Sequence, residues 1–277
     1  MAPPYLPDKK FAYPLPKFNM DELYQPTMVT ITVNNWDVPS EGCCTRNFTV
    51  QRELICRHSD YFRGAFEGRF PEARSKTITI TDTRPSAFQT FMDFLFHNEI
   101  FQEDDDPTGW SWGHLFRCYI FGDKYDSRGF RNRVFEAIQT KLLMRQPCSY
   151  QFPEGEDLIR VWENTVTSDP LRKLLVHAYV TNYRVLEDDE EQLRIFETFP
   201  VEFTHQALIF SKRLTSSNAC VHCSRDGDGR SCDNPGHTGF ETYDLVERWC
   251  LYHQHDTDRE REICGSRWEA RLDQFFD

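Results

Sequence analysis

The sequence predicts an α+β fold: three short strands and a series of short helices, followed by an all-helical C-terminal extension. Val or Ile alternates with Thr in two early segments, 28–33 and 76–82, which predicts strands with one buried face. After residue 85, large apolar residues recur at spacings of three and four, the period of an amphipathic helix. Phenylalanine is abundant, with 23 of 277 residues, and its bulky ring suits contacts between helices and a sheet.

Along the sequence, two strands are predicted before a pair of short helices and a third strand after it. A first strand is expected at MVTITV (28–33) and a second at NFTV (47–50). The segment QRELICRHSDYFRGAFEG (51–68) is expected to be helical, with Ser59 as the cap of its second helix. KTITITD (76–82) then forms the third strand. The strand residues expected to face the core are Val29, Ile31, Val33, Phe48, Val50, Ile78 and Ile80.

Longer amphipathic helices are predicted to follow the third strand. One occupies PSAFQTFMDFLFHNEI (85–100), and the acidic stretch 102–109 after it is a loop. The next helix covers the region around 112–120, and Ser127 is placed to cap another. Apolar stripes of this kind are typical of core, and here they comprise Phe88, Phe91, Met92 and Leu95, then Trp112, Leu115, Phe116, Tyr119 and Ile120, then Phe130, Val134, Ile138 and Leu142.

The chain is predicted to have three parts. Residues 1–27 contain six prolines and little periodicity, and are expected to form a mobile leader. Residues 28–146 form the first domain, and residues 150–277 form the helical extension. Within the extension, residues 214–265 carry a tail with cysteine and histidine.

The helical extension begins with a short helix at EDLIRVWENT. The next helix is SDPLRKLLVHAYV, with Ser168 or Asp169 as its cap and Pro170 in its first turn. Shorter helices are expected over 190–213. The stretch 214–239 is rich in Ser, Gly, Asp and Cys and is expected to be a loop, followed by mixed helix to the end of the sequence.

Composition excludes several classes of function. A formal net charge of −12 and a pI near 5.2 argue against binding to nucleic acid or to an anionic membrane. No run approaches the roughly 18 apolar residues of a membrane span, and the first residues lack the apolar core of a secretory signal. Five of the ten cysteines fall between residues 220 and 264, a pattern that suits metal ligands in a reducing compartment. We therefore expect an intracellular protein of the cytoplasm or the nucleus.

Two long segments resemble the BTB/POZ domain in the form common in filamentous fungi. They are FTVQRELICRHSDYFRGAFEGRFPEARSKTITITDTRPSAFQTFMDFLF and LFRCYIFGDKYDSRGFRNRVFEAI, and the resemblance covers about residues 28–145. It implies a small three-stranded sheet that caps a cluster of short helices. It also implies a docking platform for other proteins, including a second copy of the chain, rather than an enzyme. The sequence agrees, because it has no Gly-rich phosphate loop, no G-x-S-x-G elbow and no HExxH.

The resemblance also implies candidate partner-binding residues. Adaptors of Cullin-3 ubiquitin ligases in this family tend to carry a large apolar residue, any residue and then Glu before the third strand, and Phe70-Pro71-Glu72 fits that pattern. The simpler interpretation is that Phe70 belongs to the core and Glu72 ends a helix in solvent. The residues predicted at a partner surface are Phe66, Phe70, Glu72, Tyr119 and Tyr125.

The Cys/His tail predicts a structural zinc site, although the fold requires no cofactor. One ion could be held by Cys220, Cys223, Cys250 and His253, because Cys-x2-Cys and Cys-x2-His each present two ligands across a tight turn. A second allocation uses Cys250, His253, His255 and Cys264, and two ions are a third; the alternative is a set of thiols without metal. Four protein ligands would leave no open position for catalysis. A second functional hypothesis is therefore a zinc-stabilised transcriptional or regulatory factor that acts through BTB dimerisation.

Overall fold

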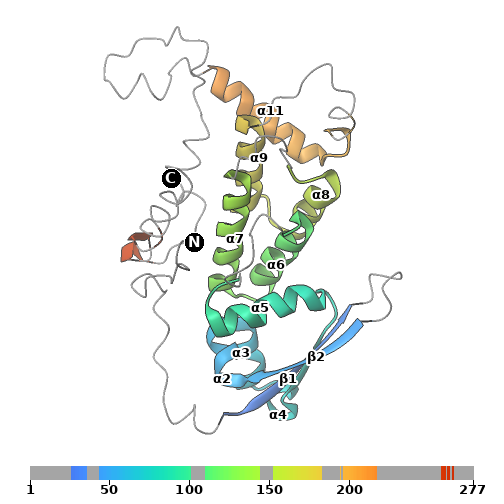
Figure 1. Cartoon of the computed structure of the whole chain (residues 1–277), viewed down its shortest axis with the longest axis vertical. Helices are drawn as coiled ribbons and strands as arrows, with labels where there is room; N and C mark the ends of the chain where they lie inside the picture. Colours follow the sequence, from blue (N-terminus) through green and yellow to red (C-terminus); the bar gives the residue numbers. More distant parts are fainter. Residues whose placement is uncertain are drawn as a thin grey trace, which may run out of the picture. The chain divides into compact units, whose positions relative to one another are not determined.

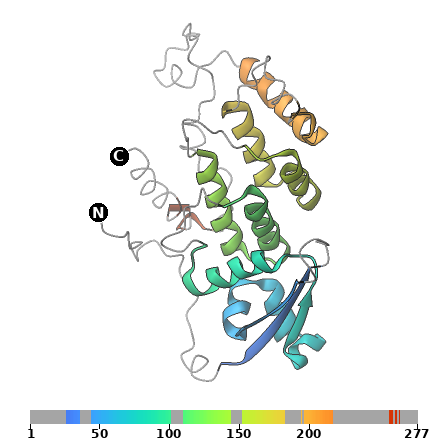
Figure 2. The ribbon, with the colours of Figure 1, turned by 45° about the vertical axis from the view of Figure 1, so that its right-hand side comes forward.

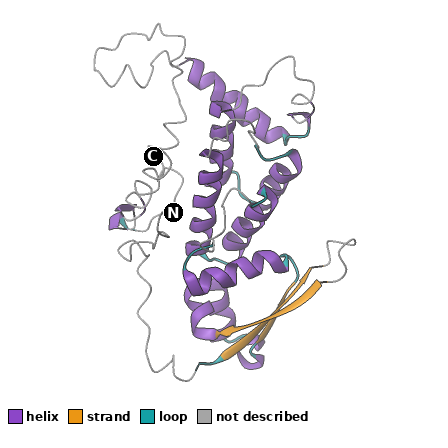
Figure 3. Ribbon diagram, in the orientation of Figure 1, coloured by secondary structure: helices purple, strands orange, loops and turns teal. Residues whose placement is uncertain are grey.

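A computed structural model describes residues 26–35, 44–100, 110–143, 152–182, 194, 196–216, 257–259, 261–262 and 264 of the chain (Figure 1). The chain divides into two compact units, Met1–Lys141 and Leu142–Asp277. The first unit contains a sheet and a group of helices, and the described part of the second unit is helical (Figure 3). The predicted α+β class with a helical extension is confirmed.

The sheet of the first unit has three strands in the order β2-β1-β3. These are β1 (Met28–Asn35), β2 (Cys44–Gln51) and β3 (Thr77–Ile80). β1 runs antiparallel to β2, with Ile31 opposite Phe48, and parallel to β3, with Ile31 beside Ile78. The first two strands are longer than the predicted ranges 28–33 and 47–50, because β1 and β2 are paired over their whole lengths.

The two faces of the sheet differ in polarity, as the alternation predicted. One face is buried and carries Val29, Ile31, Val33, Phe48, Val50, Ile78 and Ile80. The opposite face carries threonine and asparagine, and the Thr32 hydroxyl donates to Asn47 Oδ1 across the β1–β2 pair at 2.9 Å. Helices α2 and α5 contact the sheet, and α3 packs against α2 (Figure 2).

The predicted pair of short helices is present, with Ser59 between them. α2 (Arg52–His58) ends where α3 (Asp60–Glu67) begins. The Ser59 hydroxyl accepts a hydrogen bond from the Phe62 amide at 3.2 Å, which confirms the predicted cap. It also donates to the Tyr125 carbonyl at 2.5 Å and so ties α3 to a distant part of the chain.

A five-residue helix, α4 (Pro71–Ser75), follows α3 and was not predicted. It begins with Pro71 in its first turn, a position where the missing amide hydrogen costs nothing. It ends at Lys76, whose left-handed backbone (φ 58°) turns the chain into β3. A single turn is too short to display an amphipathic period, so the sequence pattern gave no signal for it.

The core of the first unit is built from aromatic rings on α5 (Pro85–His97), α6 (Trp112–Lys124) and α7 (Arg128–Leu143). Phe91 lies 5.0 Å from Phe121 and 5.3 Å from Phe130 between ring centroids, a spacing that favours tilted and edge-to-face contacts. The predicted stripes are buried, apart from Ile120 and Leu142, which are partly exposed.

One predicted cap is wrong. Ser127 directly precedes α7, and its carbonyl accepts from the Arg131 amide at 2.9 Å. Its buried hydroxyl, however, has no hydrogen-bond partner within the described part of the chain. Position before a helix therefore does not ensure a side-chain cap, since the rotamer must also aim the oxygen at the first turn.

The second unit contains α8 (Gly155–Asn164), α9 (Pro170–Asn182) and α11 (Val201–Ser216). Of the two predicted caps of α9, Asp169 is the one used: its carboxylate accepts from the Leu171 amide at 2.8 Å. α11 extends as one helix to Ser216, so the predicted loop cannot begin at residue 214. The rest of that loop lies outside the described residues.

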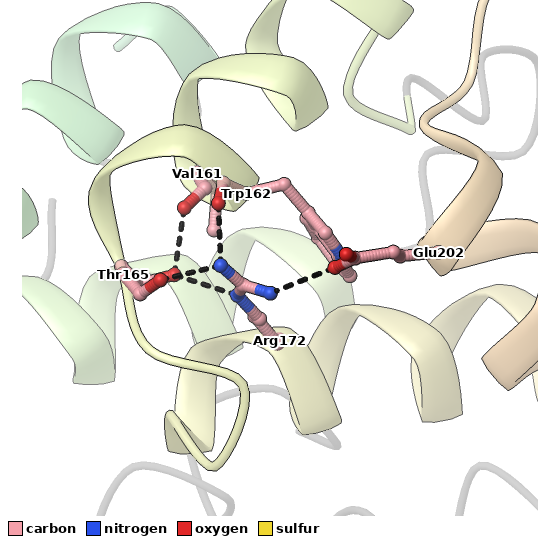
Figure 4. Close-up of polar contacts among 5 residues, drawn as sticks. All are labelled: Val161, Trp162, Thr165, Arg172 and Glu202. Atoms are coloured by element: carbon pink, nitrogen blue, oxygen red, sulfur yellow. Dashed lines mark hydrogen bonds and ion pairs between the residues drawn. The ribbon is translucent and has the colours of Figure 1, made fainter.

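A buried arginine joins these helices. The Arg172 guanidinium donates to the carbonyl oxygens of Trp162 and Thr165 and, at 2.9 Å, to the Thr165 hydroxyl (Figure 4). It lies 5.3 Å from the centroid of the Trp162 ring and pairs with Glu202 at 3.3 Å. Since Arg172 is on α9, Trp162 on α8 and Glu202 on α11, one side chain connects three helices.

Within the described residues, every helix is too short or too polar to cross a membrane.

Candidate partner-binding surface

Three of the five predicted partner-binding residues belong to the core. Phe66, Tyr119 and Tyr125 are 3%, 2% and 3% exposed. Phe66 stacks on Phe62 at 6.3 Å, and Tyr119 packs beside Phe135 at 5.9 Å. Their rings fill the interior of the first unit. Of the predicted partner-binding residues, only Phe70 and Glu72 remain candidates for a surface.

Phe70 and Glu72 do lie at the surface. The Phe70 side chain is 60% exposed, and Glu72 on α4 is partly exposed. Phe70 occupies the position just before α4 with an extended backbone (φ −77°, ψ 158°), and Pro71 begins the helix behind it. A large apolar ring in water beside a carboxylate is the arrangement of an interaction hot spot.

Gly68 controls the approach of Phe70 to α3. A Cβ atom at residue 68 would lie 2.2 Å from the Gly64 carbonyl oxygen and 3.3 Å from the Phe70 ring. Only glycine, which has no Cβ atom, allows the chain to pass so close to the Gly64 carbonyl as it leaves α3. The Phe70 ring therefore lies near the backbone at the end of α3. Gly64 has open space around its own Cβ position, so this side of α3 is uncovered by the described residues.

Tyr61 extends this surface and was not predicted. It is 43% exposed, and its ring meets the Tyr125 ring edge-on at 4.9 Å. Burial raises the pKa of its hydroxyl, and the negative charges of Asp82 and Glu72 raise it further. Tyr61 and Gly64 are three residues apart, so they share one face of α3.

A charged network borders the exposed rings. The Asp82 carboxylate is paired with the Lys124 ammonium and accepts a hydrogen bond of 2.5 Å from the Tyr125 hydroxyl. Partial burial raises the pKa of Asp82, but hydrogen bonds from Lys124 and Tyr125 outweigh it and lower the pKa below its usual value. We call the set Tyr61, Phe70, Glu72, Asp82 and Lys124 the Tyr61–Phe70 surface.

Two thiols and one imidazole of the first unit, those of Cys56, Cys118 and His58, serve packing. Burial raises the pKa of Cys56 and of Cys118 to about 12, so both thiols stay protonated and are poor nucleophiles. The His58 ring meets the Phe94 ring edge-on at 5.3 Å, and burial lowers its pKa to about 4. His58 is therefore a neutral packing residue.

The predicted zinc ligands fall almost entirely outside the described residues, namely Cys220, Cys223, Cys250, His253 and His255. Cys264 is described, and its thiol is buried and not in a disulfide. No group of three or more His, Cys, Asp or Glu side chains suited to a metal gathers among the residues that the structure describes. The zinc site therefore stays a prediction.

A comparison with known families gives one match. The family model of the BTB/POZ domain matches residues 22–119, which include all three strands, the helices α2 to α5 and most of α6. No curated protein matches the chain.

Proposed function

This chain carries a BTB/POZ domain at residues 22–119, and on this basis we propose that it docks another protein through the Tyr61–Phe70 surface. BTB/POZ domains mediate protein–protein interaction and dimerisation, and they are in general interaction modules rather than enzymes. The proposal names the surface and the kind of partner.

The observation that carries the proposal is the 60% exposure of Phe70 in a unit whose other phenylalanines are mostly buried. Moving such a ring from water into an apolar pocket contributes roughly 1.5–3 kcal/mol. Gly68 lets this ring lie close to the end of α3, because a Cβ atom at residue 68 would come within 3.3 Å of it.

Charges around Phe70 would then select the partner and set its orientation. Glu72 follows two residues later, while Lys124 and Asp82 form an ion pair. A partner that fits has an apolar pocket for Phe70 and a cationic or amide group opposite Glu72.

We propose a cullin of the Cullin-3 type as this partner, and hence a role as a ubiquitin-ligase adaptor. Support comes from Phe70-Pro71-Glu72, an apolar residue and a glutamate separated by one residue, both of which reach the surface. This role involves no nucleic acid, in agreement with the net charge of −12 on the chain.

The test is binding of the full chain to a purified cullin N-terminal region, measured by calorimetry or interferometry. The Phe70→Ala/Glu72→Ala variant is expected to raise the dissociation constant at least about tenfold, because it removes the anchor and its neighbouring charge. Phe96→Ala provides a matched control, since Phe96 is 61% exposed on α5 and should leave binding unchanged.

Equal affinity of the double variant and the wild type would refute the docking surface. Failure of the wild type to bind any cullin, with a folded chain, would refute the partner. In that case the same two variants can be compared against other candidate proteins.

A further inference from the structure

Helix α11 carries apolar residues on two sides, and described residues cover one of them. The inner side packs along α9 (Figure 1). On this side Phe203 is fully buried, and the Phe210 ring stacks on the His177 ring of α9 with 3.9 Å between their centroids. These contacts hold α11 in the second unit.

The outer side of α11 is apolar as well. Val201, Leu208 and Ile209 are 68%, 68% and 53% exposed, and we call these three residues the α11 stripe. Val201 and Leu208 are seven residues apart, which is two helical turns, and Ile209 follows directly, so the three share one side of the helix. A helix that is apolar on both sides is typical of one that is covered on both sides.

The last residues of the sequence offer a cover of matching pattern. Trp268, Leu272, Phe275 and Phe276 stand at i, i+4, i+7 and i+8, which is one side of a helix. Charged and amide residues occupy most of the other positions. The sequence therefore predicts a short amphipathic helix over 266–277, a segment that lies outside the described residues.

The two apolar sides also agree in length. Val201 to Ile209 and Trp268 to Phe276 cover the same number of residues, and each would extend about 12 Å along a helix. A helix as short as 266–277 is marginal in water by itself, so it persists only where its apolar side is covered. Each of the two sides thus supplies what the other lacks.

We propose that residues 266–277 form this helix and dock its apolar side on the α11 stripe. Both segments belong to the same compact unit, Leu142–Asp277. Because the segment is tethered to its site, its effective concentration there is on the order of millimolar, well above that of most free proteins. The chain's own end is therefore the favoured occupant, and another protein would have to displace it.

The path of the chain toward the segment supports this assignment. Cys264 is 1% exposed, so the chain is already packed two residues before the segment begins. Less conformational freedom then remains to be lost when the segment docks. Roughly 50 residues separate the end of α11 from the segment, and the entropic cost of closing a loop rises only slowly with its length.

The charges beside the α11 stripe suit a weakly acidic segment. Glu202 pairs with Arg172, and Lys212 lies one turn beyond Leu208 on the exposed side. Within 266–277 the acidic residues are Glu269, Asp273 and Asp277, and the basic ones are Arg267 and Arg271. This small excess of negative charge is compatible with a neighbouring lysine.

A second apolar stretch of the chain fits less well. In FETYDLVERWCLY (240–252) the apolar residues are spread around the whole circumference of a helix. It also contains Cys250, one of the predicted zinc ligands. The segment 266–277 is therefore the better candidate to cover α11.

This inference goes beyond the docking function, because it concerns the second unit and none of the residues of the Tyr61–Phe70 surface. The Phe70→Ala/Glu72→Ala variant should leave it unchanged, so each proposal can fail without the other.

The experiment is hydrogen–deuterium exchange of the full chain, followed by mass spectrometry. In the wild type, residues 266–277 should be protected. Leu208→Asp should speed their exchange at least about tenfold, because a carboxylate cannot enter an apolar contact without a large cost. Val166→Asp is the matched control: Val166 is 67% exposed between α8 and α9, and its replacement should leave the exchange of 266–277 unchanged.

The reverse substitution separates docking from a local loss of helix. Leu272→Asp should speed the exchange of 266–277 and also that of α11, whereas Gln274→Asp, on the polar side of the segment, should change neither. In all four variants α8 should exchange as in the wild type, which shows that the unit is folded.

Three results would overturn the proposal. The first is a wild-type segment 266–277 that exchanges as fast as an unfolded peptide. The second is equal exchange of the segment in Leu208→Asp and Val166→Asp, which would leave the α11 stripe to another protein. The third is protection of the segment that disappears on dilution, which would make a second copy of the chain the occupant.

Discussion

The Tyr125 hydroxyl donates a 2.5 Å hydrogen bond to the Asp82 carboxylate, so a residue after α6 is tied to the turn after β3. Tyr125 also stacks on Phe121 at 4.5 Å and receives the edge of Tyr61 at 4.9 Å. This one ring thus connects the core to the exposed surface on α3.

Tyr125→Phe should destabilise the first unit by about 1 kcal/mol, because it removes this hydrogen bond and keeps the ring packing. Asp82 is exposed and retains Lys124, so water can replace the lost donor and the cost stays modest. Chemical denaturation with tryptophan fluorescence measures the change. A variant more stable than the wild type would mean that the bond carries strain rather than stability.

Ser59→Ala should cost more, about 2 kcal/mol, because the hydroxyl is buried and makes two hydrogen bonds. Ser111→Ala is the comparison. Ser111 caps α6 through one bond of 3.2 Å from the His114 amide and is exposed, so about 0.5–1 kcal/mol is expected. Equal losses in the two variants would argue against the second bond of Ser59.

Acid should weaken the fold through His58. Burial, and then the neighbouring charge of Arg57, lower its folded pKa to about 4 from the ordinary 6.5. As the pH falls, His58 therefore takes up a proton in the unfolded chain before it does so in the folded chain. The contribution of neutral His58 to the free energy of unfolding is complete above pH 6.5 and is lost as the pH falls to about 4. His58→Phe should flatten the dependence of the melting temperature on pH in this window. An unchanged slope would mean that the imidazole is solvated in the folded state.

Arg172→Leu should destabilise the second unit by about 3 kcal/mol, because it leaves the buried carbonyls of Trp162 and Thr165 without their donor (Figure 4). Glu202→Gln should cost less than about 1 kcal/mol, since the Glu202 side chain is 68% exposed. The pair of variants, followed by thermal unfolding, separates the carbonyl contacts from the ion pair. A larger loss of stability for Glu202→Gln than for Arg172→Leu would contradict this expectation.

Metal analysis of the purified chain tests the predicted zinc site. If Cys250, His253, His255 and Cys264 hold one ion, Cys264→Ser should release it, and a chelator should lower the melting temperature of the wild type. If Cys220, Cys223, Cys250 and His253 hold it, Cys264→Ser should keep a full equivalent of zinc. A wild-type chain purified without zinc and unable to bind added zinc would end the prediction.

Much of the first unit could be predicted from local pattern. The alternation of Val29, Ile31 and Val33 placed β1, and Ser59 marked the break between two helices, because both signals lie within a few residues. α4 escaped prediction because one helical turn has no period. Ser127 was misjudged because a cap depends on a rotamer that sequence does not specify.

The candidate surface was harder to predict because exposure depends on packing between distant segments. Phe66 and Phe70 are four residues apart, yet one is in the core and the other in water, since the chain leaves α3 at Gly68 between them. Tyr61 is next to Phe62 in sequence but on another side of α3. Only the contacts with α5 and with Tyr125 decide which ring is covered.

The close passage of the chain at Gly68 limits how this domain can diverge. Adding one methyl group there must displace the backbone at the Gly64 carbonyl of α3 and would also crowd the ring of Phe70, even though residue 68 need never touch a partner. Lineages that keep the docking role are therefore expected to keep glycine at this position, and a replacement in a related sequence would mark loss or relocation of the anchor.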